Sequence, residues 1–510
     1  MKLNYKRTIL VGFAFFLISA FWQAYDAIVP LILTNHFGLP QTVSGVVMSV
    51  DNVLAVFMLP IFGALSDKVT SRFGKRTPFV VIGTVAAVLS FVLLTVVNGI
   101  QINAITDAGI VEEYNMAASV HSAALERLNE SFDKGLITEA ARNAGIAEAD
   151  AALDAVKAAL RSDALELTLS NIWPLIGFIG VLLIVLIAMA TYRSPAVALM
   201  PDVTVKPLRS KANAIINLMG TAGGIIILVF SSVFGISKNP YMSYTAYVVA
   251  TCIVMLAGLA VFVLTVKEKR WADEMEATTL KLGLEEKEPS ADEDAPKRAL
   301  DKAEFKSLML ILASVALWYI GYNSITSKYS VYSTNVLGVD YGLTLIVAQA
   351  AAIVSYIPVG IVASKFGRRK TILAGIIMLA TAFFIGNFIS AGASNLVMYP
   401  IFALAGIGWA TINVNSFPMV VELARGGDVG KYTGYYYTAS MAAQIVAPIF
   451  SGALYDLFDI FTGGNGMRYV FFAFGTVFVI LSFVTMFFVK HGDAKPETQG
   501  ALEALAGADD

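Results

Sequence analysis

The sequence predicts an all-α membrane protein whose twelve transmembrane helices form two pseudo-symmetric six-helix bundles. Hydrophobic residues make up 57% of the 510 residues and charged residues only 15%, which is more apolar surface than soluble cores need. Twelve apolar stretches reach the length of roughly 20 residues that crosses a bilayer core. Short motifs of the first half also recur at equivalent places in the second half.

The predicted spans fall into two groups of six. In the first half they lie near 9–33, 43–65, 78–97, 172–200, 212–235 and 241–266. In the second half they lie near 307–333, 342–364, 371–390, 396–416, 432–454 and 467–489. We therefore expect the following parts: an N-terminal bundle over 1–266 with an insertion at 98–170, a linker at 267–306, a C-terminal bundle over 307–490 and a tail at 491–510.

Basic residues collect in the loops on one side of these spans. Only Lys238 and Arg468 stand out in the short loops on the other side. Because positive loops remain in the cytoplasm, we expect a multi-pass protein of the cell membrane with both termini cytoplasmic. The cytoplasmic basic residues are then Lys68, Arg72, Lys75, Arg76, Lys206, Arg209, Lys211, Lys365, Arg368, Arg369, Lys370, Arg425 and Lys431.

Two hydrophilic segments interrupt the apolar pattern. Residues 98–170 are rich in alanine and acidic residues, with spaced apolar residues that predict amphipathic helices outside the membrane. A lid, a partner-docking site and a neutral insertion all remain open for this segment. Residues 267–306 are charged and contain Pro289 and Pro296, a composition that predicts a flexible cytoplasmic linker between the bundles.

The two halves share two motifs. Asn35-His36-Phe37-Gly38 after the first span recurs as Asn335-Val336-Leu337-Gly338 after the seventh. The loop GALSDKVTSRFGKRTP, which starts at Gly63, follows the second span, and GIVASKFGRRK, which starts at Gly360, follows the eighth. Parallel repeats of this kind are typical of transporters with a solute pathway between the halves.

These loops resemble the signature of the major facilitator superfamily, Gly-x-x-x-Asp-x-x-Gly-Arg-Arg, although Ser364 replaces the acid in the second copy. The form of the first copy is similar to the glycoside-pentoside-hexuronide and sucrose-transporter families, which are sugar-cation symporters. Helix-end glycines and Asp67 in such loops allow contacts that latch one conformation; a basic loop that only sets topology is the alternative. The latch candidates are Gly63, Asp67, Arg72, Gly74, Lys75, Arg76, Gly360, Gly367, Arg368 and Arg369.

Asp26, Asp51, Arg193 and Lys328 are charged residues that lie well inside the predicted spans, away from the span ends. Charge within a membrane is costly, so each is a candidate for a solute or proton pathway, with a static ion pair as the alternative. Melibiose-type symporters carry an acid where Arg193 precedes Pro195 here. This departure disfavours sodium, so we expect a proton as the coupling ion, with Asp26 as its first carrier and Asp51 as its second.

Aromatic and amide side chains within the spans are candidates for holding a sugar, by ring stacking and paired hydrogen bonds. For each of them, a packing contact or an interhelical hydrogen bond is an equal alternative. The candidates are Trp22, Tyr25, Asn217, Trp318, Tyr322, Gln349, Trp409, Asn413, Tyr437 and Gln444.

The expected function is proton-coupled symport of a sugar or glycoside by alternating access. An exporter of amphipathic compounds and a membrane sensor on the same fold remain as alternatives: a narrow cavity lined by aromatic and amide groups favours sugar, and a wide apolar one favours export. We expect no enzyme, metal site, cofactor or nucleic-acid partner, since the net charge is only −2 and no catalytic or metal-ligand motif stands out. His36, His121 and His491 are expected to be solvated. The oligomeric state stays open, and a monomer suffices for this scheme.

Overall fold

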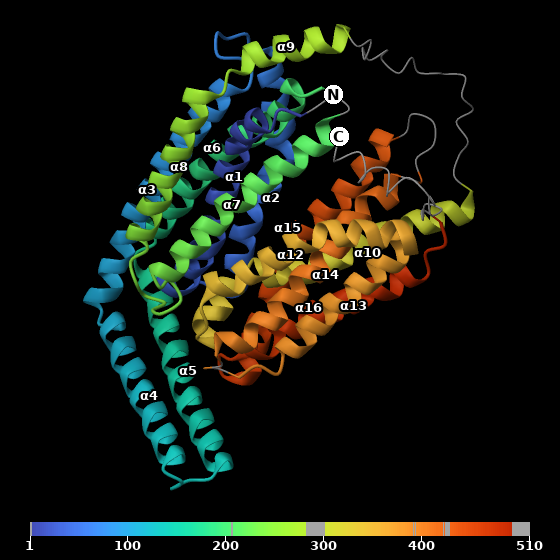
Figure 1. Ribbon diagram of the computed structural model, residues 1–510. Coiled ribbons are helices and arrows are strands. Elements are labelled where there is room, and N and C mark those ends of the chain that lie inside the picture. Colours follow the sequence, from blue (N-terminus) through green and yellow to red (C-terminus); the bar gives the residue numbers. More distant parts are fainter. Residues whose placement is uncertain are drawn as a thin grey trace.

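The computed structural model describes residues 3–205, 208–281, 301–390, 394–421 and 429–491, together with residues 392 and 423. Helices form the regular secondary structure of these parts, arranged as two bundles that lie side by side (Figure 1). The expected all-helical membrane fold is confirmed. Several expectations concern positions outside the described residues: Lys206, Arg425, part of the linker and nearly all of the tail.

In the described parts of the chain, each bundle contains six long helices. The N-terminal bundle consists of α1 (Tyr5–Leu31), α2 (Gln41–Lys68), α3 (Thr77–Asp107), α6 (Trp173–Val203), α7 (Arg209–Val233) and α8 (Thr245–Thr265). The C-terminal bundle consists of α10 (Lys302–Thr326), α12 (Tyr341–Phe366), α13 (Arg368–Gly386), α14 (Asn395–Val421), α15 (Val429–Thr462) and α16 (Gly466–Phe487).

The outer faces of the bundles are apolar. On α3, Ile82, Leu89 and Val96 recur every seven residues and are 65%, 66% and 60% exposed, a stripe that is stable against lipid rather than water. Eleven helices of the described residues are long and apolar enough to cross a membrane. The remaining predicted span, 342–364, corresponds to α12, where the apolar helix with described side chains, Tyr341–Tyr356, is shorter than the other eleven. The chain is therefore a multi-pass membrane protein.

Two predicted spans end differently from the prediction. α1 continues into a π-helical turn, η1 (Ile32–His36), and the predicted span 307–333 is broken at Ser327 and Lys328. A short helix, α11 (Tyr329–Tyr332), and a second π-helical turn, η3 (Ser333–Leu337), follow the break. Both π-helical turns lead to a glycine with positive φ, 65° at Gly38 and 70° at Gly338, a conformation that favours glycine. The repeated sequence motif is thus also a repeated structural motif.

The hydrophilic segments contain helices of their own. The first ten residues of the predicted insertion prolong α3, and the rest forms a helical hairpin of α4 (Ile110–Asp133) and α5 (Glu139–Ser170) that projects from one end of the N-terminal bundle (Figure 1). The amphipathic helices expected there are present. The first part of the linker differs from the prediction of a flexible segment. It forms a helix, α9 (Glu268–Lys281), and Glu268 is buried against the N-terminal bundle.

We call the end where α1 ends and α2 begins the hairpin end, and the opposite end, where α2 ends and α3 begins, the basic end. Hydrogen bonds join the two bundles at the hairpin end. Asn335 Nδ2 donates to Asn35 Oδ1 at 2.8 Å, so the two repeat motifs meet each other directly. The Asp456 carboxylate of α15 accepts from the backbone N–H groups of Gln41 and Thr42, both at 2.7 Å. These contacts close the hairpin end.

Candidate solute cavity

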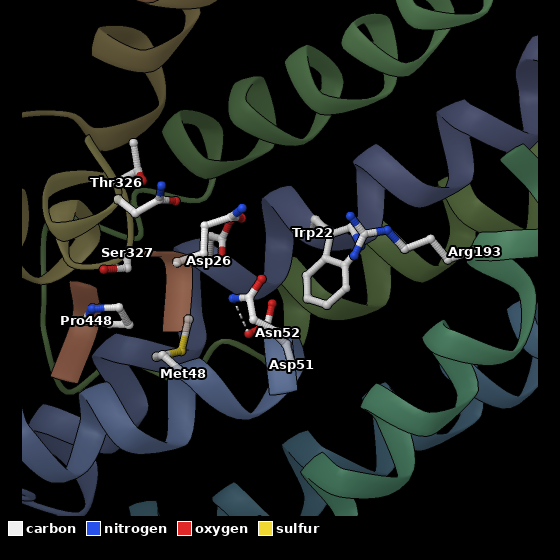
Figure 2. Close-up of a pocket in the computed structure, with 11 residues that line it drawn as sticks. Trp22, Asp26, Met48, Asp51, Asn52, Arg193, Thr326, Ser327 and Pro448 are labelled. Atoms are coloured by element: carbon white, nitrogen blue, oxygen red, sulfur yellow. Dashed lines mark hydrogen bonds between the residues drawn. The ribbon is translucent and has the colours of Figure 1, made fainter. Parts of the chain in front are cut away.

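A cavity of about 170 Å³ lies between the two halves. Five helices of the two bundles, α1, α2, α6, α10 and α15, contribute side chains to it, and Ser327, directly after α10, completes its wall (Figure 2). Its lining is mostly polar, with carboxylates, a guanidinium, amides and hydroxyls. The lining residues are Trp22, Asp26, Met48, Asp51, Asn52, Arg193, Asn323, Thr326, Ser327, Gln444 and Pro448.

Three of the four predicted charges converge on this cavity. Asp26 comes from α1, Asp51 from α2 and Arg193 from α6. The Arg193 guanidinium lies 5.6 Å from the centre of the Trp22 ring, a cation–π distance. Asp51 and Asn52 lie side by side, and Asn52 Nδ2 donates to Asp51 Oδ1 at 2.8 Å (Figure 2). Two carboxylates against one guanidinium leave the cavity with a net negative charge when all are ionised.

Lys328 does not join the other charges. It follows the break after α10, is fully buried, and donates from Nζ to Ser44 Oγ of α2 at 2.6 Å. Its neighbourhood is the closed hairpin end, where the Asp456 carboxylate also lies. The expectation of a cavity charge is therefore wrong for Lys328, because the helix break carries its side chain across to α2 rather than into the cavity.

Of the predicted sugar-binding candidates, Trp22 and Gln444 line the cavity. Tyr25 packs edge-on against Trp22, with ring centroids 5.3 Å apart. Tyr322 stacks on Trp409 at 5.8 Å. Gln349 Nε2 donates to Gln23 Oε1 at 3.0 Å and so bridges α12 and α1 between the halves.

The remaining candidates lie away from the cavity lining. Trp318 is fully buried and packs on Tyr319. Asn217 donates to the carbonyl of Asn213 on its own helix, Tyr437 is 51% exposed beside Phe417, and Asn413 is half-buried. Sequence reasoning missed Met48, Asn52, Asn323, Thr326, Ser327 and Pro448; the position of Asn52 beside Asp51 was the one usable signal.

The first copy of the predicted latch forms an ion-pair cluster at the basic end. The Arg76 guanidinium contacts Asp67 at 2.5 Å and Asp202 at 2.7 Å, and it also donates to Ser66 and the Gly63 carbonyl. Burial opposes its charge, but Asp202 and Asp67 together raise the pKa of Arg76. Within this loop, Arg72 lies over the Phe73 ring, Gly74 has φ 115°, and the Lys75 N–H donates to Glu268.

The second copy of the latch is built differently. Gly360 has open space where a side chain would stand, and Gly367 takes φ 90° between α12 and α13. Arg368 and Arg369 begin α13, and Arg369 donates to the Phe487 carbonyl of α16. The side chain of Ser364 lies outside the described residues. An acid-to-arginine cluster is therefore described only for the first copy.

The expectation that His36 is solvated is wrong. The π-helical turn carries its ring into the bundle, where it is fully buried, stacks on Tyr244 and hydrogen-bonds to Asn98 at 3.0 Å. His121 pairs with Asp150 in the hairpin, and His491 pairs with Ser307. In the described residues, no group of histidine, cysteine and acidic residues has a metal-binding arrangement.

Comparison with known proteins bears on this arrangement. A model described as Major Facilitator Superfamily matches residues 164–354 and 336–507, and one described as MFS/sugar transport protein matches residues 10–104. Proton-associated sugar transporter A of Mus musculus is 32% identical over 120 residues, 23% of this chain. The Homo sapiens protein of the same name is 35% identical over 93 residues, 18% of this chain. These matches span only 15% and 12% of the relatives' own lengths.

Solved structures share the fold over nearly the whole chain. The inward-open xylose transporter XylE from E. coli superimposes with a TM-score of 0.56 at 15% identity, covering 98% of this chain and all of that one. The nucleoside transporter NupG superimposes with a TM-score of 0.53 at 12% identity, covering 95% of this chain and all of that one. At such identities the likeness establishes the fold alone.

Proposed function

The chain belongs to the Major Facilitator Superfamily, and from that premise we propose that it is a secondary active transporter that moves a sugar or glycoside together with a proton by alternating access. Its partners are a small-molecule solute and the lipid bilayer. The matched relatives are transporters, not enzymes. The names of the xylose transporter XylE and of the proton-associated sugar transporter support the solute and ion proposed for this chain.

The observation that carries the proposal is the size and polarity of the cavity. At about 170 Å³ it is smaller than the roughly 300–1,000 Å³ pockets that hold drug-sized ligands. Its amides and hydroxyls, from Asn52, Asn323, Gln444, Thr326 and Ser327, suit a solute with many hydroxyls, since each can donate and accept hydrogen bonds. An exporter of amphipathic compounds would need a wider and more apolar space.

The charges of the cavity support a proton as the coupling ion. Asp26 and Asp51 together exceed the single positive charge of Arg193, so one added proton neutralises the site. A sodium ion carries the same charge but needs several oxygen ligands at once, whereas a proton needs one carboxylate oxygen; the Arg193 guanidinium in the same small space supplies no ligand. Asp26, Asp51 and Arg193 all belong to the N-terminal bundle, whereas Asn323 and Gln444 of the same lining belong to the C-terminal bundle, so rocking of one bundle against the other changes the exposure of the two carboxylates to water.

We further propose that the basic end faces the cytoplasm and that the membrane is the cell membrane. Arg72, Lys75 and Arg76 between α2 and α3 lie at this end, as do Arg368, Arg369 and Lys370 at the start of α13. Basic residues at span ends are retained in the cytoplasm. The hairpin end then faces outward, and its closed contacts correspond to a state that excludes the outside.

The test is uptake of radiolabelled mono- and disaccharides into proteoliposomes, with and without an inward proton gradient. We expect gradient-driven accumulation of at least one sugar. Asp26→Asn and Arg193→Gln should lower the accumulation at least about tenfold, the factor that roughly 1.4 kcal/mol produces. Asp133→Asn and Arg127→Gln make the same changes at exposed positions of the hairpin and should leave the accumulation unchanged.

Two results would count against the proposal. If no sugar enters under any gradient, export or sensing becomes the better explanation of the fold. If sugar accumulates with a sodium gradient but not with a proton gradient, the proposal of symport is retained and the proposal of a proton as the coupling ion is wrong.

A further inference from the structure

The α4–α5 hairpin is firmly attached to the N-terminal bundle. Its base shares a buried cluster with the ends of α3 and the α7–α8 connection, formed by Ile105, Ile110, Tyr114, Leu160, Ala164 and Tyr241. Gln101 Nε2 of α3 donates both to Thr168 Oγ1 of α5, at 3.0 Å, and to the His36 carbonyl, at 2.9 Å. Since buried packing and the hydrogen bonds of the Gln101 amide join them, the hairpin moves with the N-terminal bundle as one body.

The middle of α5 reaches across to the other bundle. Lys157 Nζ donates to the backbone carbonyl of Asn335 at 2.9 Å, and Asp154 Oδ2 lies 3.8 Å from Arg468 Nη1 of α16. α5 also lies close to the α15–α16 turn: a methyl group added to Gly464 of that turn would lie 2.9 Å from Cβ of Ala158 in α5. These contacts join the hairpin to η3 and to the start of α16.

The charged groups of this contact are largely removed from water. The side chains of Lys157 and Asp154 are 14% and 13% exposed and lie 3.5 Å apart. Burial lowers the pKa of Lys157 and raises that of Asp154. Removing one partner from a shielded contact costs more than removing an exposed ion pair, so the contact contributes to the energy of the state that contains it.

The contact lies at the closed end of the solute pathway. Asn335 accepts from Lys157 with its carbonyl and pairs with Asn35 through its amide. The hairpin therefore adds a second layer over the amide pair that joins the repeat motifs. Among the described residues, the C-terminal bundle has no equivalent hairpin. The equivalent place in its sequence lies between α13 and α14, which are joined by a short connection.

We propose that the hairpin is a docking arm for the C-terminal bundle: segment 154–161 binds the rim formed by η3 and the α15–α16 turn when the hairpin end is closed, and leaves it when that end opens. The inference rests on the alternating-access part of the proposed function and not on the solute or ion. Rigid-body motion of the bundles must separate the two surfaces, because one belongs to each body. The contact therefore stabilises one state selectively and shifts the equilibrium toward the closed hairpin end.

Distances between two spin labels test this proposal without any solute or gradient. Labels on Ser243→Cys in the α7–α8 connection and Phe388→Cys after α13 occupy exposed positions at the hairpin end of each bundle, outside the hairpin itself. Cys252 is replaced by serine so that only these two thiols react. Pulsed electron paramagnetic resonance on the full chain in lipid nanodiscs then gives the populations with short and long distances.

Lys157→Met and Arg468→Gln each remove one side of the contact from a different bundle. We expect each to raise the ratio of long to short distances by about tenfold, which corresponds to roughly 1.4 kcal/mol. Lys134→Met is the matched control: Lys134 lies on the same hairpin, its ion pair is with Glu130 one turn earlier, and both side chains are 60% exposed. It should leave the ratio unchanged.

Identical distance distributions in the wild type, Lys157→Met and Arg468→Gln would overturn the proposal and leave a neutral insertion. An equal shift in Lys134→Met would also overturn it, because the effect would then not depend on the docking contact. Failure of sugar uptake alone would instead count against the proposed function, since the distance measurement requires no sugar.

Discussion

Glu268 is a single carboxylate that holds a helix end and a linker together. Its two oxygens accept four hydrogen bonds from the start of α3: the N–H groups of Lys75, Arg76 and Thr77, and the Thr77 hydroxyl. The first N–H groups of a helix have no partner within it, and the positive end of its dipole favours an anion. Glu268 supplies both a partner and a charge, and it fixes α9 to the loop that carries Arg76.

Glu268→Gln tests this role at the scale of one residue. The amide keeps the size of the side chain but removes the charge and one acceptor, so we expect a loss of about 1–2 kcal/mol in stability. The midpoint of thermal unfolding in detergent should fall by a few degrees. Glu276→Gln changes an exposed residue of the same helix and should leave the midpoint unchanged; an equal fall in both variants would contradict the role of Glu268.

At the scale of elements, the hairpin end closes because α2 and α15 approach backbone to backbone. Gly45 of α2 faces the Pro448 carbonyl, and Gly452 of α15 faces the Gln41 carbonyl, so that any side chain at either glycine would collide with the opposite helix. Small residues at such crossings are what bring membrane helices together, since lipid offers no hydrophobic drive between them. The pair of glycines sets how closely this end of the protein can close.

Gly45→Ala should therefore shift the protein away from the closed hairpin end. With the labels on Ser243→Cys and Phe388→Cys, we expect a larger population of long distances, because the added methyl group overlaps the backbone of Pro448. Gly99→Ala is the control: Gly99 lies in α3 with no atom near the new methyl group, and alanine favours a helix. A distribution unchanged by Gly45→Ala would show that the crossing relaxes without opening.

At the scale of the whole molecule, the two halves meet through equivalent residues of the two repeats. Asn35 and Asn335 follow the first and seventh spans and pair reciprocally across the interface. Alternating access requires this pair to separate in each cycle.

Cross-linking across that pair should stop transport. With Cys252 replaced, Asn35→Cys and Asn335→Cys joined by a short bis-thiol reagent should abolish uptake, which should persist in the same protein without the reagent. Ser314→Cys and Ser482→Cys make a matched pair inside the C-terminal bundle, where the hydroxyls are 2.8 Å apart; joining them should leave uptake intact. Uptake that survives the Asn35–Asn335 cross-link would exclude opening at the hairpin end as a step of transport.

Much of the fold follows from the sequence alone. Span length, apolar content and loop charge are properties of short stretches, and the bilayer acts on each stretch separately. For this reason the twelve spans, the repeat motifs and the amphipathic hairpin are predictable. That Asp26, Asp51 and Arg193 line a polar cavity is predictable for the same reason, because a charge in a span needs a polar surrounding wherever its partner lies.

What the tertiary structure decided is which residues meet. Lys328 turns to Ser44 at the closed end because α10 breaks before it, and His36 enters the bundle because α1 ends in a π-helical turn. Glu268 contacts the start of α3, which lies 191 to 193 residues earlier in the sequence. Lys157 contacts Asn335, which lies 178 residues later. The local sequence shows that a polar group within a span or at a helix end needs a hydrogen-bond partner, but which residue is that partner depends on how the bundles pack.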